Sequence, residues 1–189
     1  MRRYLKIGLV LLFAFLFVGC AEPEPNEIQK ASELLLAGNL PEALAYFEKS
    51  VALEEELDLA WRGIGFVKFQ MNDFEGAALA FTTALEQGAE ESPVIYNILG
   101  THAMRELNFE GAIYYFEQGI ALIEAVGVDG DAEAEWDYQE LQQSLKHSRI
   151  VAYERMFRWE RARELIEEYI MLYPDDAEAK REAEFLRTR

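Results

Sequence analysis

The sequence predicts an all-α solenoid of about four helix–turn–helix units, closed at its C-terminal end by a capping helix. The main observation is a four-residue motif that occurs twice: Phe-Glu-Gly-Ala at 74–77 recurs at 109–112, 35 positions further on. Self-similarity at such an interval is typical of stacked helix pairs, because one pair cannot bury its apolar face and the next pair covers it. The chain is also 51% hydrophobic and 13% aromatic, which argues against disorder.

The pattern around both copies extends over two whole units, at about 58–91 and about 92–126. In the first unit, apolar and small residues recur at helical spacing, at Trp61, Ile64, Gly65, Ala77, Phe81 and Ala84. In the second unit, the matching positions hold Tyr96, Leu99, Gly100, Ala112, Phe116 and Gly119. This pattern resembles the tetratricopeptide repeat (TPR), whose two antiparallel helices carry W-x₂-L-G-x₂-Y and then A-x₃-F. The resemblance implies a right-handed TPR-like α-solenoid over 27–189.

Two weaker units flank these two. In the unit at about 27–57, a turn at Gly38–Asn39 separates the helices, and the second helix matches the pattern at Ala43, Phe47 and Ser50. In the unit at about 131–174, the second helix and its end match at Trp159, Ala162, Ile166 and Pro174. A polar capping helix over 175–187 then closes the stack, since an open solenoid end exposes apolar surface.

An insert at about 126–142 separates the third and fourth units. No helix breaker follows Asp131 for about 25 residues, so we expect the first helix of the fourth unit to be lengthened and to project beyond the stack. Trp136 and Tyr138 on this overhang either pack against the second helix of the third unit or form a contact surface.

Capping residues predict where four of the helices begin. Asn26 is followed by Gln29 three positions on, which is a capping-box spacing. We also expect helix starts at Asp58, at Ser92–Pro93, and at Asp175 after Pro174.

The N-terminal residues 1–19 have the features of a secretory signal peptide. An apolar run at 7–18 follows three cations, Arg2, Arg3 and Lys6. The run is too short to cross a hydrocarbon core of about 30 Å as a helix.

The only cysteine of the chain, Cys20, directly follows this segment. Gly19–Cys20 resembles the lipobox of bacterial lipoproteins, and the resemblance implies a lipid on Cys20 and a place on the exported side of a bacterial envelope membrane. Residues 20–26 would then form the lipidated cysteine and an extended, proline-containing tether. The alternative is an uncleaved anchor in which Cys20 is an idle thiol.

The net charge limits the partners. The chain carries −17, and loss of the three N-terminal cations would leave −20. A protein with this negative charge is repelled by nucleic-acid phosphates and by anionic lipid headgroups. We therefore expect no nucleic-acid partner, and we expect that only the lipid on Cys20 contacts the membrane.

Few residues could support catalysis or metal binding. The two histidines, His102 and His147, belong to different units and lack the spacing of a zinc site. The acidic residues at 129–133 have part of the spacing of a calcium-binding loop, but Asp131 is better explained as a helix N-cap. We expect no metal, no cofactor and no enzymatic activity.

The TPR resemblance implies that the first helices of the units line a concave groove for a partner. The positions that usually face the ligand hold Arg62, Phe66, Phe69 and Gln70 in the second unit, Asn97, Thr101, Met104 and Arg105 in the third, and His147, Val151 and Arg155 in the fourth. Arginines beside aromatic and methionine side chains suit a peptide with acidic residues. The alternative is that these arginines only balance neighbouring glutamates.

The sequence therefore favours a membrane-tethered TPR protein that binds a partner protein or peptide and acts as an adaptor or assembly factor in the bacterial envelope. A second hypothesis is a structural component that forms homo-oligomers through the extended helix. A third is an accessory subunit of an envelope enzyme. The pattern specifies the fold more closely than the task.

Overall fold

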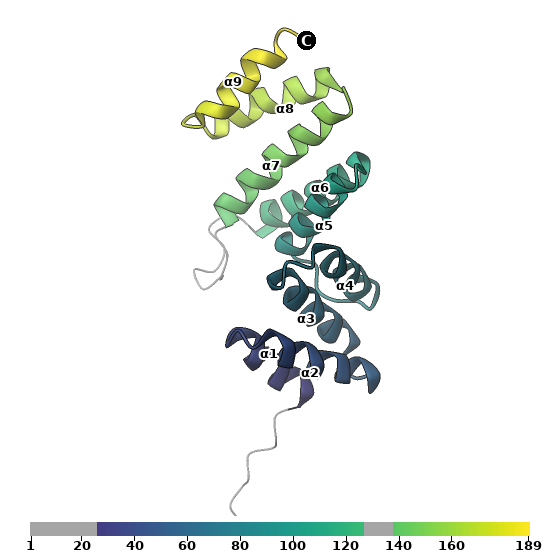
Figure 1. Ribbon diagram of the computed structural model, residues 1–189. Helices are drawn as coiled ribbons and strands as arrows, with labels where there is room; N and C mark the ends of the chain where they lie inside the picture. The colour runs from purple at the N-terminus through teal and green to yellow at the C-terminus, as the bar shows by residue number, and fades with distance from the viewer. Residues whose placement is uncertain (1–25, 127–137) are drawn as a thin grey trace, which may run out of the picture.

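The structure, a computed structural model, describes residues 26–126 and 138–189. Within these ranges the chain forms helices and no strands, as the sequence predicted. The helices are α1 (Glu27–Leu36), α2 (Leu40–Ala52), α3 (Leu57–Gln70), α4 (Phe74–Glu86), α5 (Pro93–Arg105), α6 (Phe109–Val126), α7 (Tyr138–Arg155), α8 (Trp159–Leu172) and α9 (Ala177–Leu186). They stack in chain order into an elongated solenoid, with α1 and α2 at one end and α9 at the other (Figure 1).

Successive helices form four pairs, α1/α2, α3/α4, α5/α6 and α7/α8, and α9 packs on the last pair. The core runs through the boundaries between pairs as clusters of buried side chains. Phe47 and Ile64 share one cluster between the first two units, and Phe81 and Ile95 share the next. Each unit therefore buries its apolar face only with the help of its neighbour, as expected for a solenoid.

In the second and third units, a glycine on the first helix contacts an aromatic ring on the second helix of the same unit. A Cβ atom added at Gly65 would lie 2.6 Å from the ring of Phe81, which is fully buried. Gly100 and Phe116 form the same contact in the third unit. The wider repeated pattern, which includes Gly65 with Phe81 and Gly100 with Phe116, thus corresponds to a repeated helix–helix contact, and the predicted all-α solenoid is confirmed.

The turn inside each unit contains one residue in the left-handed region at the same position. These residues are Gly38, Asn72, Leu107 and Phe157, with φ of 78°, 63°, 59° and 57°. In each turn, the N–H of the next residue donates to a carbonyl oxygen five residues earlier, at 2.8–3.0 Å. This pattern is the Schellman motif, which satisfies the last carbonyls of the first helix.

Two of the predicted helix starts are confirmed, and two are wrong. Asn26 forms the full capping box with Gln29, and α5 begins with Pro93 directly after its N-cap, Ser92. Asp58, in contrast, lies inside the first turn of α3, whose N-cap is Glu56 with φ of 43°. The chain completes its turn earlier than expected because Glu54 and Glu56 both adopt positive φ.

The capping helix α9 also begins later than predicted. Asp176 rather than Asp175 is its N-cap, and the Asp176 carboxylate accepts hydrogen bonds from the N–H groups of Glu178 and Ala179 at 3.0 and 2.9 Å. These two bonds satisfy backbone N–H groups of the first turn that have no partner within the helix. The negative charge of the carboxylate also interacts favourably with the helix dipole.

Several sequence expectations lie outside the described residues. They are the signal peptide, Cys20, most of the insert at 126–142, Asp131 and Trp136. Tyr138, the first residue of α7, packs against the core cluster that α6 and α7 share, which is one of the two alternatives for this residue. Among the described residues, no helix combines the length and the apolar character that crossing a bilayer requires.

Candidate functional site

The boundary between the second and third units is more open than the others. The connection between α4 and α5, residues 87–92, is longer than the connections at 53–56 and 173–176. The first helices α1 and α3 approach each other closely, as do α5 and α7, but no Cα atom of α3 lies within 8 Å of one in α5. The first helices of the second and third units therefore lie further apart than those of the other neighbouring units.

A cavity of about 310 Å³ occupies this space. Side chains from both units form its wall, namely Phe69, Phe74, Asn97, Ile98, Thr101, His102 and Arg105. Asn97, Thr101 and Arg105 are spaced by four residues, so they lie along one face of α5. The cavity thus combines an aromatic side from the second unit with a polar side from the third.

Arg105 is held over the aromatic side of the cavity. Its guanidinium carbon lies 4.9 Å from the ring centroid of Phe74, within the range of a cation–π contact. Phe74 in turn meets Phe69 edge-to-face, with ring centroids 5.7 Å apart. No salt bridge of Arg105 is found among the described residues, so its charge is positioned by a ring and is free to meet an anion.

His102 stands at the centre of the open boundary. It contributes to the cavity above and to two adjoining hollows, of about 380 and 270 Å³, which Glu75 and Glu106 also line. Asp73, at the edge of the smaller hollow, is already satisfied: the Gly76 N–H donates to it at 2.9 Å, and Lys68 lies 3.0 Å from its other oxygen. The Gly76 hydrogen bond, followed by that from Lys68, lowers the pKa of Asp73.

Four of the predicted groove residues line this cavity: Phe69, Asn97, Thr101 and Arg105. The other predicted residues of these units lie elsewhere. Phe66 packs edge-to-face on Phe81, with centroids 5.0 Å apart, and Met104 packs on the core cluster of α6. Arg62, half-buried, and Gln70, exposed, are not part of the cavity wall.

The predicted groove residues of the fourth unit have a different environment. His147 Nε2 lies 2.8 Å from Glu182 Oε2 on α9, and the His147 ring lies 5.6 Å from that of Tyr169. The hydrogen bond to Glu182 raises the pKa of His147 above its ordinary value. His147 therefore belongs to the contact with the capping helix and not to an open groove, while Val151 is half-buried and Arg155 exposed on α7.

Sequence reasoning missed three residues of the cavity: Phe74, Ile98 and His102. Phe74 is the first residue of α4 and so lies outside the first-helix positions used for the prediction. Ile98 and His102 each follow a predicted residue by one position, on the side of α5 that faces the second unit. A search for the helix stripe facing the preceding unit would have found these two.

The described residues contain no group of three or more His, Cys, Asp or Glu side chains arranged to hold a metal ion. The cavity wall offers aromatic contact, amide and hydroxyl hydrogen bonds, and one guanidinium.

No family model matches the chain, and no curated protein matches it in sequence. Several solved structures are similar to it, among them the following two. The crystal structure of the APC/C hetero-tetramer Cut9–Hcn1 has a TM-score of 0.53 and 17% sequence identity, covering 85% of this chain and 29% of that one, so this chain spans less than a third of that protein. The crystal structure of YrrB, a TPR protein with an unusual peptide-binding site, has a TM-score of 0.51 and 22% identity, covering 84% of this chain and 90% of that one. The chain accordingly has an all-α TPR-type fold.

Proposed function

We propose that this protein binds a partner protein or peptide in the cavity between its second and third units. In this proposal it acts as a non-catalytic adaptor or assembly factor, tethered to a bacterial envelope membrane by a lipid on Cys20. The observation that carries the proposal is the Arg105 guanidinium, which forms no ion pair within residues 26–126 and 138–189 and lies over Phe74 at the edge of an aromatic cavity. The fold similarity to YrrB, a TPR protein with a peptide-binding site, is consistent with it.

The wall of the cavity specifies the kind of peptide. Phe69 and Phe74 offer a surface for one apolar side chain, and a volume of about 310 Å³ suffices for a side chain and its flanking backbone. Asn97 and Thr101 can donate to and accept from peptide groups of an extended segment. Arg105 would pair with a carboxylate, so the preferred segment has an acidic residue next to an apolar one.

Site-specific photocrosslinking tests the proposal. A benzoylphenylalanine at Thr101, which is exposed and lines the cavity, should crosslink a partner in cells of the native organism. The same residue at Ala121, exposed on α6 and absent from the cavity wall, is the matched control.

Charge reversal at the cavity gives the second arm of this test. Arg105→Glu should abolish the Thr101 crosslink, whereas Arg181→Glu, an equal charge change at an exposed site on α9, should leave it intact. Far-ultraviolet circular dichroism would verify that both variants remain helical. A crosslink that persists in Arg105→Glu at wild-type yield would refute the role of the cavity.

A further inference from the structure

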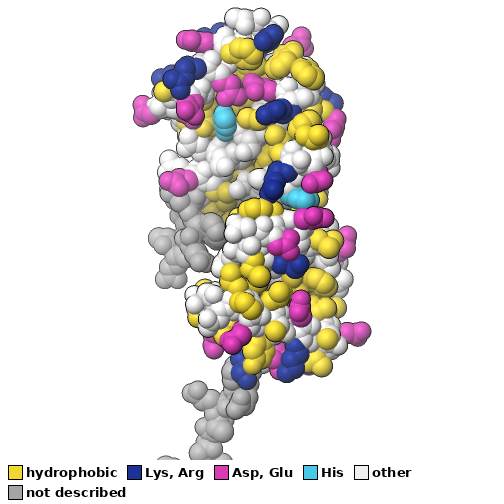
Figure 2. Space-filling view, viewed as in Figure 1, with side chains coloured by type: hydrophobic (Ala, Val, Ile, Leu, Met, Phe, Trp, Pro, Cys, Tyr) yellow, Lys and Arg dark blue, Asp and Glu magenta, His cyan; other side chains and the backbone are white. Residues whose placement is uncertain are grey.

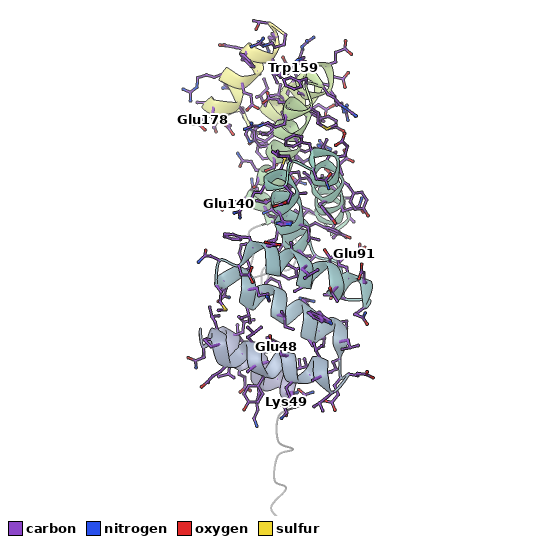
Figure 3. All side chains as sticks on the ribbon, turned by 45° about the vertical axis from the view of Figure 1, so that its right-hand side comes forward. Glu48, Lys49, Glu91, Glu140, Trp159 and Glu178 are labelled. Atoms are coloured by element: carbon purple, nitrogen blue, oxygen red, sulfur yellow. The ribbon has the colours of Figure 1, made fainter. Side chains whose placement is uncertain are left out.

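A second surface with the chemistry of a binding site lies at the other end of the solenoid. It surrounds a hollow of about 650 Å³ next to the turn between α7 and α8, and we call it the arginine patch. The patch consists of Phe157, Arg158, Trp159, Arg161, Arg163 and Arg189, and Glu160 and Glu164 also border the hollow. Trp159 marks its position at the α8/α9 end, far from Lys49 on α2 (Figure 3).

The arginine patch is a local exception in an acidic protein. Residues 26–126 contain 5 Lys and Arg against 17 Asp and Glu, a net charge of −12. Residues 138–189 contain 10 against 11, a net charge of −1. Four arginines fall within 155–163, where Glu160 is the single acid. Acidic and hydrophobic side chains are prominent on the lower part of the face shown in Figure 2.

The cations of the patch are only partly neutralised. Arg158 forms no ion pair with any residue in the described ranges, and Arg161 pairs with Glu164 at 2.8 Å. Arg189 is positioned by rings, with its guanidinium carbon 4.6 Å from the centroid of Phe185 and 5.9 Å from that of Trp159. Elsewhere on this end, cations meet carboxylates, as in the bidentate contact of Arg187 with Glu167 at 2.8 and 3.0 Å.

Phe157 adds an apolar side chain to the patch, and most of this side chain lies outside the core. Its side chain is 75% exposed, and its φ of 57° lies in the left-handed region, which is unfavourable for a bulky residue. The equivalent turn positions in the first and second units hold Gly38 and Asn72, which tolerate this region. The Phe157 ring stands edge-to-face on Trp159, with centroids 5.6 Å apart. Leu107, with φ of 59°, occupies the same position in the third unit, so the backbone conformation alone does not distinguish Phe157. What distinguishes Phe157 is its exposed ring, which rests on the half-buried Trp159 beside the arginines of the patch.

We propose that the arginine patch is a second binding site, which accepts an acidic peptide segment with an apolar side chain. Carboxylates of the segment pair with Arg158, Arg161 and Arg189, and the apolar side chain rests on the Phe157–Trp159 ring pair. The cavity between units two and three plays no part in this contact. With one site near the middle and one at the end away from the N-terminal helices, the protein can hold two segments at once.

Fluorescence anisotropy tests this proposal with the full chain in mild detergent. The probe is a fluorescein-labelled peptide of glutamates interrupted by leucine and phenylalanine, and the same peptide with lysine for glutamate is the charge control. The acidic probe should bind, more weakly at higher salt, and the lysine probe should bind at least about 10-fold more weakly, because the contact is electrostatic in part.

Two double variants with equal changes of net charge locate the site, and both are compared in the Arg105→Glu background, which removes binding of the probe in the cavity between the second and third units. Arg158→Glu with Arg161→Glu should weaken binding of the acidic probe by about 10-fold or more. Lys180→Glu with Arg181→Glu, on the exposed face of α9, should change it by less than about twofold. Equal affinities in these two double variants would overturn the proposal.

Phe157→Asn keeps the test decisive if the charge variants fold poorly. Asparagine tolerates the left-handed region, so this variant should unfold at a higher temperature while its affinity for the probe falls by about fivefold. Undiminished affinity would overturn the proposal. Sedimentation velocity gives the last arm: if the wild type forms dimers that Arg158→Glu with Arg161→Glu dissolves, the occupant is a second copy of this chain, and the peptide proposal is wrong.

Discussion

Replacing Leu107 by asparagine should stabilise the protein, although it removes an apolar side chain. Leu107 occupies the left-handed turn position of the third unit with φ of 59°, and its side chain is 73% exposed. A left-handed backbone costs an ordinary L-residue about 1 kcal/mol or more, and asparagine adopts it more readily. The burial lost is about a quarter of a leucine side chain, on the order of 0.5 kcal/mol.

The expected net gain for Leu107→Asn is about 0.5 kcal/mol, or a rise in Tm of about 1–2 °C for a chain of this size. Asn72, with φ of 63° at the same position of the second unit, demonstrates that the turn accepts asparagine. Urea unfolding followed by circular dichroism would measure the difference in the free energy of unfolding, provided that the m-values agree.

Leu79→Asn is the matched control, because the chemical change is identical and the exposure similar. Leu79 is 68% exposed, but it lies inside α4, where asparagine is a poorer helix former than leucine by about 0.5 kcal/mol. With the lost burial, this variant should be less stable than the wild type by about 1 kcal/mol. If Leu107→Asn is destabilised as much as Leu79→Asn, the assignment of strain to the turn is refuted.

Other perturbations test the helix contact, the cap and the anchor. Gly65→Ala should destabilise the fold by about 1–3 kcal/mol in urea unfolding, because the added methyl group meets the ring of Phe81, and Phe81→Leu in the same chain should recover part of the loss. Burial raises the pKa of Glu154 from 4.5 to about 7, and the hydrogen bond to Glu182 raises the pKa of His147. Stability is therefore highest at acid pH and is lost as these groups release their protons, so Tm should fall between about pH 4.5 and about pH 7, and Glu154→Gln should reduce the dependence. Cys20→Ala should shift the protein from membrane to soluble fractions in cell fractionation, and persistent membrane association would indicate an uncleaved anchor.

The helix pairs could be predicted from the sequence because each depends on contacts that recur at fixed spacing. The Gly65–Phe81 contact appears in the chain as a small residue and an aromatic one, and the same spacing returns in the third unit. Helix starts were less predictable, since a capping residue acts only where the preceding backbone turns correctly. Asp58 and Asp175 have suitable side chains, but the chain enters the helix earlier at one and later at the other.

The candidate site was predictable in part, for a related reason. Phe69 and Arg105 follow from the face that a first helix presents to the groove. His102 lies on the stripe of α5 that faces the preceding unit, one position after Thr101. Phe74, the first residue of α4, lies outside the first helices and depends on how the second and third units meet, which no helical periodicity encodes. His147 was expected in the groove because its helix position is equivalent, but Glu182 reaches it from the capping helix. Its position depends on a contact between residues that are distant in sequence.

The separation of α3 from α5 explains why a cavity of about 310 Å³ lies between the second and third units. At the first boundary, residues 53–56 hold α3 against α1, and the side chains between them, such as Phe47 and Ile64, close into a core. At the second boundary, Phe81 and Ile95 also share a core, but α5 stays apart from α3, and the cavity lies beside this core. An isolated cavity would be a defect in packing, but this one places an arginine that forms no ion pair within the described ranges over an aromatic ring. The separation of α3 from α5 therefore creates the surface that the proposed partner would fill, and a bound segment would link these two helices, which do not approach each other directly.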